Sequence, residues 1–276
     1  MQVRQPANPR DFESYTTERI REEFLIQNLF IPDEMVLTYS HIDRMIIGGV
    51  CPEKALSLEG GSELGTEFFL ERRELGIINV GPEGTVSVDG QGYELNRNEG
   101  LYVGQASREV LFSSKDPKHP AHFYMLSGPA HQAYPTMKIT PADAESVRLG
   151  SQEQANVRVL NKYIHPDGVK SCNLVMGITV VEPDSVWNSL PPCHLHARRM
   201  EVYFYYDLPS DAAVFHLMGE PERTRHIVVR NEEAVISPSW SIHAGAATSN
   251  YAFIWGMIGD NQAFGDMDLV DMDRLK

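Results

Sequence analysis

Short apolar runs follow one another along most of the chain, and turn residues separate them. Residues 35–39, 45–50, 75–80 and 84–88 are examples, rich in aliphatic side chains, and the pair Asp89-Gly90 marks one of the breaks. Runs of this length, with β-branched and aromatic residues, are typical of β-strands. Because few segments show a helical pattern, the chain is predicted to be all-β, as a sandwich or a barrel.

One helix is expected near the N-terminus. Thr17 is placed at its cap, and the helix runs to about Asn28 with Ile20, Phe24 and Leu25 on one face. The polar residues before it are expected to be loose or to lie over a neighbouring element.

Two groups of predicted strands flank a segment of different composition. Residues 127–156 are polar and rich in proline, which is typical of a connection between domains. A chain of 276 residues is long enough for two domains with cores of their own. We therefore expect an N-terminal barrel over residues 1–126, a linker over 127–156 and a C-terminal barrel over 157–276.

The composition restricts the class of partner and the compartment. The hydrophobic content of 42% is that of a globular protein, and the net charge of −14 argues against nucleic acid and membrane surfaces as partners. Three widely spaced cysteines do not form a disulfide framework, and their odd number fits a reducing compartment. No apolar run reaches membrane-spanning length, and the first residues lack the apolar region of a signal peptide. These features predict a cytoplasmic protein.

The candidate chemistry lies in the second half of the chain. His194 and His196 would point to the same side of a β-strand, because successive side chains alternate. Glu201 has the wrong parity for that strand, so it can join them only if the chain reverses over residues 197–199 and Glu201 opens the next antiparallel strand. His243 follows another apolar run and completes the set. Three imidazoles and one carboxylate suit zinc, and also iron, manganese or nickel.

Residues around these four suggest how a substrate could be held. By strand alternation Tyr203 and Tyr205 share the face of Glu201, so their hydroxyl groups either reach the cavity or pack in the core. Arg198 and Arg199 lie at the corner, where they could bind a carboxylate through paired hydrogen bonds or stay solvated. The candidates for a proton-transfer group are Lys162, Tyr163 and His165.

A short internal repeat links the two halves. Arg72-Arg73 precedes an apolar strand as Arg198-Arg199 does, and residues 97–99 (Arg-Asn-Glu) precede another as residues 230–232 do. This pattern suggests two duplicated barrels. Where the second half has its candidate ligands, the first half has Phe68, Leu70, Leu75 and Val110. We therefore expect the N-terminal barrel to be a degenerate copy without metal ligands.

The same residues resemble the motifs of the cupin superfamily. His194, His196 and Glu201 are similar to its first motif, and residues 238–243 are similar to its second, with Trp240 where that motif usually has glycine. The resemblance implies a tandem double-stranded β-helix, or bicupin, with the short helix at its N-terminus.

Longer segments resemble one family within that superfamily. Residues 39–44, 69–76, 198–205, 236–243 and 253–257 are similar to the 5-keto-4-deoxyuronate isomerase family. The resemblance implies one Zn²⁺ per chain, bound by His194, His196, Glu201 and His243, and a homohexamer. It also implies a uronate substrate from pectin breakdown, 5-dehydro-4-deoxy-D-glucuronate, which is isomerised to 3-deoxy-D-glycero-2,5-hexodiulosonate.

Three other interpretations fit the same pattern. A different cupin metalloenzyme, such as an iron dioxygenase, would consume oxygen. A non-catalytic sugar-acid binding protein would bind without turnover, but it would ordinarily carry a basic DNA-binding segment, and this acidic sequence shows none. The zinc could also be purely structural, with catalysis elsewhere in the same cavity.

Overall fold

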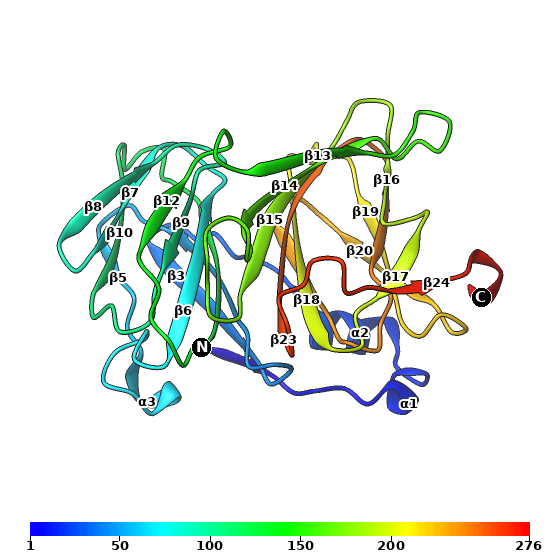
Figure 1. Ribbon diagram of the computed structural model, residues 1–276, viewed down its shortest axis with the longest axis horizontal. Helices are drawn as coiled ribbons and strands as arrows, with labels where there is room; N and C mark the ends of the chain where they lie inside the picture. Colours follow the sequence, from blue (N-terminus) through cyan, green and yellow to red (C-terminus); the bar gives the residue numbers. More distant parts are fainter. The chain divides into compact units, whose positions relative to one another are not determined.

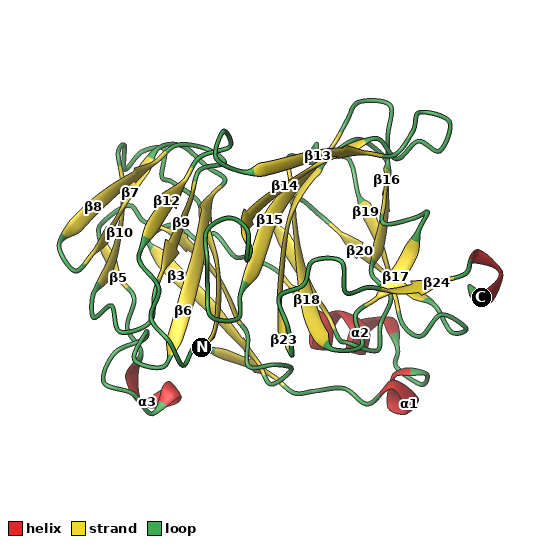
Figure 2. Cartoon of the chain, in the orientation of Figure 1, coloured by secondary structure: helices red, strands yellow, loops and turns green.

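β-Strands make up most of the regular structure, and the helices are short (Figure 2). The structure is a computed structural model that describes residues 1–276, apart from the side chain of Ser62 and the exposure of Gly61. The helices are α1 (Pro9–Phe12), α2 (Thr17–Phe24), α3 (Gly61–Leu64) and the 3-10 turn η1 (Met272–Arg274). Within the described residues, none of these helices is long and apolar enough to cross a membrane. The all-β prediction is confirmed.

The first of two compact units comprises residues 1–3, 28–144 and 163–175. Its strands are β1 (Gln2–Arg4), β3 (Glu34–Ser40), β4 (Ile46–Cys51), β5 (Leu56–Ser57), β6 (Arg73–Asn79), β7 (Gly84–Val88), β8 (Gln91–Leu95), β9 (Gly100–Val103), β10 (Val110–Ser114), β11 (Phe123–Pro129) and β12 (Met137–Ile139). They form a seven-stranded sheet in the order β1-β3-β4-β11-β6-β9-β12 and a four-stranded sheet in the order β5-β10-β7-β8 (Figure 1). Side chains from both sheets, including Val86, Leu101 and Phe123, share one apolar core.

The second unit comprises residues 4–27, 145–162 and 176–276. Its strands are β2 (Leu25–Ile26), β13 (Glu145–Leu149), β14 (Arg158–Ile164), β15 (Val175–Val181), β16 (Trp187–Asn188), β17 (Cys193–Leu195), β18 (Arg199–Tyr206), β19 (Val214–Met218), β20 (Arg225–Val229), β21 (Glu233–Ser237), β22 (Ala244–Ala247), β23 (Ala252–Gly259) and β24 (Asp268–Val270). The seven-stranded sheet has the order β13-β14-β15-β23-β18-β21-β2, and the four-stranded sheet has the order β16-β22-β19-β20. A separate pair is formed by β17 and β24.

The order of strands repeats between the two units, in agreement with the internal repeat. In the larger sheets β3-β4-β11-β6-β9 corresponds to β14-β15-β23-β18-β21, and in the smaller sheets β5-β10-β7-β8 corresponds to β16-β22-β19-β20. The matching strands β6 and β18 begin at Arg73 and Arg199, which are both buried and donate to backbone carbonyl groups. Leu70, Leu75 and Val110, which align with candidate ligands of the second half, are buried in the apolar core of the first unit.

The boundaries of the units differ from those expected from composition. Residues 4–27 group with the second unit, because β2 pairs with β21. Residues 127–156, expected to be a linker, contain β12 and β13, which pair with β9 and β14. Residues 163–175 group with the first unit, although they follow the expected start of the C-terminal barrel. Backbone pairing between distant strands sets these boundaries, and local composition does not encode it.

The N-terminal helix differs slightly from the prediction. The hydroxyl oxygen of Thr16, rather than that of Thr17, accepts a hydrogen bond from the backbone N–H of Arg19 at 3.3 Å and caps α2. The helix ends earlier than expected, at Phe24, because the next two residues pair with β21 as β2. Ile20 and Phe24 are buried, as the pattern predicted.

The larger sheet of the second unit carries the residues that build the candidate site. Within it β14, β15, β23 and β18 are consecutive neighbours. The register of β18 with β23 places Glu201 opposite Met257 and Tyr203 opposite Trp255. Residues that face each other across an antiparallel pair lie on the same side of the sheet. These four side chains therefore share one face.

Candidate metal centre

The four candidate ligands come together in the second unit. His194 comes from β17, His196 from the residue that follows this strand, Glu201 from β18, and His243 from the residue before β22. All four are buried, and one nitrogen or oxygen atom of each lies within 4.8 Å of the others. Within the described part of the chain, no other group of three or more His, Cys, Asp or Glu side chains converges in this way.

The chain reverses between His196 and Glu201, as strand parity required. Ala197 and Arg198 form the turn, and β18 begins at Arg199. Two details differ from the prediction, since β18 opens before Glu201 and β17 pairs with β24 rather than with β18. Parity therefore predicts the reversal but not the partner of the strand.

The ligand atoms of the cluster point at one another. Nε2 of His243 lies 3.0 Å from Nε2 of His194 and 2.9 Å from Oε2 of Glu201. Nε2 of His196 lies 3.3 Å from the same oxygen. No donor among the described residues meets this buried oxygen with ordinary hydrogen-bond geometry. Such convergence of imidazole nitrogens on a carboxylate oxygen fits a divalent cation held between them.

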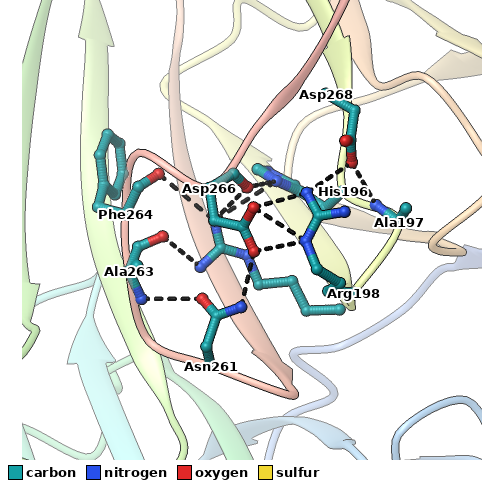
Figure 3. Close-up of polar contacts among 9 residues, drawn as sticks. His196, Ala197, Arg198, Asn261, Ala263, Phe264, Asp266 and Asp268 are labelled. Atoms are coloured by element: carbon teal, nitrogen blue, oxygen red, sulfur yellow. Dashed lines mark hydrogen bonds and ion pairs between the residues drawn. The ribbon is translucent and has the colours of Figure 1, made fainter.

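Polar groups behind the cluster orient two of the imidazoles. Nδ1 of His196 lies 3.0 Å from the backbone carbonyl oxygen of Asp266, so Nδ1 carries the proton and Nε2 is free to act as a ligand (Figure 3). Nδ1 of His243 lies 3.4 Å from Oγ of Ser237. Arg199, which is 1% exposed, donates to the same carbonyl oxygen of Asp266 at 3.0 Å. The metal-facing nitrogens are therefore fixed by contacts on their far side.

The electrostatic environment shifts the pKa values of His194 and Glu201 toward the forms that bind a metal. Burial, together with the neighbouring His243 and His196, lowers the pKa of His194 to about 2, so this imidazole is neutral. Burial opposes ionisation of Glu201, but His243 and His196 hold the pKa of its carboxyl group below the usual range. Neutral imidazoles and an ionised carboxylate are the forms that coordinate divalent ions.

The cluster lies on the wall of a cavity of about 380 Å³. His194, His196, Glu201 and Tyr203 contribute to its lining. Much of the remaining wall is apolar or aromatic, with Leu160, Phe253, Trp255, Met257, Phe264 and Met267. A concave and largely apolar site with a few polar groups at one place is typical of a pocket for a small molecule.

The sequence matches the family model described as the KduI/IolB family over residues 25–272. The chain belongs to the KduI/IolB family. This family member is 56% identical over 277 residues to the 4-deoxy-L-threo-5-hexosulose-uronate ketol-isomerase of Caldicellulosiruptor bescii, and the match covers 100% of both chains. It is 57% identical over 281 residues to the protein of the same name from Lachnospira eligens, again over 100% of both chains.

Solved structures share the fold of this KduI/IolB member. The crystal structure of an IolB-like protein from Salmonella typhimurium has a TM-score of 0.71 at 12% identity, covering 90% of this chain and 96% of that one. An oxalate decarboxylase of Bacillus subtilis has a TM-score of 0.56 at 9% identity, covering 81% and 71%. Likeness at such low identity concerns the fold alone. Together with the repeated order of strands, it confirms the predicted bicupin.

The two corner arginines of this KduI/IolB member are already paired within the chain. Nη2 of Arg198 lies 2.5 Å from the carboxylate of Asp266 and 2.9 Å from that of Asp268 (Figure 3). Arg199 donates to backbone carbonyl groups, including that of Ala263 at 2.9 Å. Neither belongs to the described lining of the cavity. This geometry supports a role in bracing the segment behind His196 rather than the predicted role in substrate binding.

Tyr203 and Tyr205, which were expected to act together, have different surroundings. Tyr203 lines the cavity, and its hydroxyl oxygen lies 3.5 Å from Oγ of Ser189. The hydroxyl group of Tyr205 lies 2.7 Å from Nδ1 of the buried His216, and Tyr205 is absent from the described cavity lining. The geometry supports a cavity role for Tyr203 and a core role for Tyr205.

The candidates for proton transfer have other partners. Nζ of Lys162 lies 2.8 Å from Oε1 of Glu145 and 4.9 Å from the ring centre of Phe264. Tyr163 and His165 group with the first unit. There the Tyr163 hydroxyl donates to the backbone carbonyl of Asn98 at 2.6 Å. These contacts give no support to a role in proton transfer.

Sequence reasoning missed several polar residues that line the cavity, among them Arg158, Thr179 and Trp255. A signal existed for Arg158, because it is a charged residue inside the apolar strand sequence of residues 157–160. Charged side chains are rarely buried without a partner. No comparable signal marks Thr179, since threonine is common in strands of every kind.

Proposed function

We propose that this protein is a metal-dependent ketol isomerase that converts 5-dehydro-4-deoxy-D-glucuronate to 3-deoxy-D-glycero-2,5-hexodiulosonate. One observation carries the proposal. A buried cluster of three histidines and one glutamate lies on the wall of a cavity, in a chain that is 56% identical over its full length to a 4-deoxy-L-threo-5-hexosulose-uronate ketol-isomerase.

Zn²⁺ is the proposed ion, with one ion per chain. The residues that would hold it are His194, His196, Glu201 and His243. Imidazole nitrogens and carboxylate oxygens are common donors for zinc, although they also accept other divalent ions. When bound, the ion supplies a Lewis acid that polarises oxygen atoms of the substrate.

The proposed reaction moves a carbonyl group by one carbon. The open-chain substrate has an aldehyde next to a hydroxyl-bearing carbon, and the product has a ketone at that carbon and a primary alcohol in place of the aldehyde. One proton passes between the two carbons and one between the two oxygens, so the reaction needs no oxidant or reductant. Apolar walls such as Phe253 and Met257 keep bulk water away from these transfers.

Tyr203 is the cavity side chain best suited to act on the substrate oxygens. Burial and the nearby negative charge of Glu201 raise the pKa of Tyr203 well above its usual value, so Oη keeps its proton. A neutral hydroxyl group of this kind donates a hydrogen bond to an oxygen atom on which negative charge develops. Tyr203 would thereby stabilise the negative charge that develops on a substrate oxygen while a proton moves between the two carbons.

A cytoplasmic location and a homohexamer belong to the same proposal. All three cysteines are free in the structure, which suits a reducing compartment. The hexamer rests on the resemblance to the family. Light scattering coupled to size-exclusion chromatography tests it, since a species of six chains supports the assembly and a monomer contradicts it.

A turnover assay tests the proposed reaction. The monouronate released by pectate oligomer lyases is the substrate, and proton NMR follows the loss of the aldehyde form and the gain of the ketone product. We expect turnover by the wild type, and a Glu201→Gln variant that keeps its circular dichroism spectrum but loses metal and activity.

Each other outcome points to a different function. Wild-type activity in a metal-depleted Glu201→Gln variant would contradict metal dependence. Binding without turnover would indicate a sugar-acid binding protein, and oxygen uptake would indicate a dioxygenase. Loss of folding in the variant would indicate a structural ion.

A further inference from the structure

We infer that Arg158, Thr179 and Trp255 form a subsite for the carboxylate end of the substrate and so set its orientation relative to the metal cluster. All three residues line the cavity. The inference rests on the proposed function, because it states which end of the uronate each part of the cavity holds.

Arg158 is a buried cation without a carboxylate partner. The residue is 8% exposed, and its Nη1 donates to the backbone carbonyl of Asn156 at 2.8 Å. No carboxylate of the described residues forms an ion pair with it. A guanidinium group has five N–H donors, so most of them remain available to a ligand. Because burying an unpaired cation costs free energy, an anion is the ligand expected beside it.

Further hydrogen-bond donors of the cavity wall lack partners, and two of them lie on the strands between Arg158 and Glu201. Thr179 is 1% exposed and Trp255 is 2% exposed. Neither Oγ1 of Thr179 nor Nε1 of Trp255 has a hydrogen-bond partner among the described residues. Buried polar groups are nearly always hydrogen-bonded, and an indole N–H can only donate. The two groups therefore suit the acceptor oxygens of a bound molecule.

The order of strands places these donors in a row that leads away from the metal cluster. Glu201 lies on β18, and the next strands across the sheet are β23 with Trp255, β15 with Thr179 and β14 with Arg158. Neighbouring strands lie about 4.8 Å apart, so the backbones of β14 and β18 are separated by roughly 14 Å. Arg158 and Glu201 both line the cavity and come from strands three places apart in the sheet, so the two ends of a bound acid can meet different parts of its wall.

The substrate carries its charge and its reacting carbons at opposite ends. With the carboxylate on Arg158, the aldehyde and its neighbouring hydroxyl group lie toward the histidine cluster. The reverse orientation would place the carboxylate at the metal ligands and leave Arg158 unpaired. The subsite therefore favours one orientation and favours uronates over neutral sugars.

Replacement of Arg158 by methionine tests the subsite, because methionine keeps much of the apolar length and removes the charge. We expect Arg158→Met to raise KM for the uronate roughly 100-fold, with a smaller change in kcat, since a charge-assisted bond to the carboxylate is lost. Metal content and melting temperature should stay near those of the wild type. Arg148→Met is the matched control, because Arg148 is exposed and pairs with Glu182, and its KM should not change.

Two conservative variants keep the test decisive if Arg158→Met does not fold. Arg158→Lys retains the charge without the planar fork and should give an intermediate KM. Thr179→Val retains the shape without the hydroxyl group and should raise KM by several-fold. A wild-type KM in folded, metal-loaded Arg158→Lys and Thr179→Val variants would overturn the inference.

Binding of glucuronate, with glucose as the uncharged control, tests the subsite without turnover. Calorimetry should show that the wild type binds glucuronate more tightly than glucose. This preference should be smaller in Arg158→Lys and lost in Arg158→Met. Equal binding of the two sugars by the wild type would overturn the inference. If the wild type prefers glucuronate but does not isomerise the uronate, the result would contradict the proposed function. It would still support the carboxylate subsite.

Discussion

His196 and Arg199 share one acceptor, the backbone carbonyl oxygen of Asp266. Nδ1 of His196 and Nη2 of Arg199 each lie 3.0 Å from it, and Figure 3 shows how Asp266 lies against His196. Arg199 also donates to the carbonyl groups of Ala263 at 2.9 Å and Phe264 at 3.3 Å. A buried arginine thus fixes the segment that orients a candidate metal ligand.

Replacing Arg199 by lysine should weaken metal binding without preventing folding. Lysine keeps the positive charge but lacks the planar fork that reaches several carbonyl groups at once. Loss of a group that supports a metal ligand typically lowers metal affinity about 10- to 100-fold. Competition for Zn²⁺ with a chromophoric chelator measures the change, and Arg148→Lys on the surface is the control. A folded Arg199→Lys variant with wild-type affinity would show that the arginine does not support the site.

The two tyrosines should separate into one that affects turnover and one that affects stability. Tyr203→Phe removes a donor from the cavity wall and should lower kcat by about 10- to 100-fold while the metal stays bound. Tyr205→Phe leaves the buried Nδ1 of His216 without its partner, which should lower the free energy of unfolding by about 1–3 kcal/mol with KM unchanged. Steady-state kinetics and urea denaturation of both variants measure these effects. The opposite assignment of effects would contradict the surroundings described for the two side chains.

His216 should make the folded state sensitive to acid. Burial, together with the nearby His243, lowers its pKa from the usual 6.5 to about 3. Above pH 6.5 the imidazole is neutral in the folded and the unfolded states, so it has no effect on stability there. Between that pH and about 3 only the unfolded state takes up the proton, and the free energy of unfolding falls by up to about 1.4 kcal/mol per pH unit.

A His216→Gln variant isolates this effect. Urea denaturation from neutral to acidic pH, with chelator present for both proteins, should show a shallower loss of stability in the variant. The slopes of the free energy of unfolding against pH should differ by up to about 1.4 kcal/mol per pH unit, which corresponds to the uptake of one proton. Parallel curves for the two proteins would mean that His216 is protonated in the folded state.

Gly177 should control the position of Trp255. A Cβ atom at residue 177 would overlap the Trp255 ring and the carbonyl oxygen of Asn161. Gly177→Ala should therefore displace the indole from the cavity wall, raise KM by several-fold and destabilise the fold by about 1–3 kcal/mol. Gly92→Ala is the matched control, because its Cβ would meet only Thr85 at an ordinary 3.7 Å. Unchanged kinetics and stability in Gly177→Ala would indicate that the wall adapts freely.

The candidate metal ligands could be predicted from the sequence, but their supporting contacts could not. Strand parity alone required the chain to reverse between His196 and Glu201, and the structure has that reversal. The acceptors of Arg198 and Arg199 are carboxylates and backbone carbonyl groups of residues 263–268. No spacing rule in the sequence connects residues 263–268 to Arg198 and Arg199. Their contacts could therefore be found only from the structure.

The sequence was enough to predict two similar barrels, but it was not enough to predict the boundaries of the two units. Alternating short strands and the paired Arg72-Arg73 and Arg198-Arg199 signals indicated two similar barrels. The two-residue strand β2 has too little sequence to give a pattern, and it exists through its pairing with β21. For that reason, composition gave no sign that residues 4–27, which include the N-terminal helix, group with the second unit.

Turnover as a function of metal ions bound per chain is the most direct measurement of the central claim. Protein stripped by chelator is titrated with Zn²⁺, and the rate of uronate isomerisation is recorded at each ratio. We predict no turnover without metal, a linear rise on addition, and a plateau at one ion per chain. Full turnover by the stripped protein would contradict the role assigned to the His194, His196, Glu201 and His243 cluster.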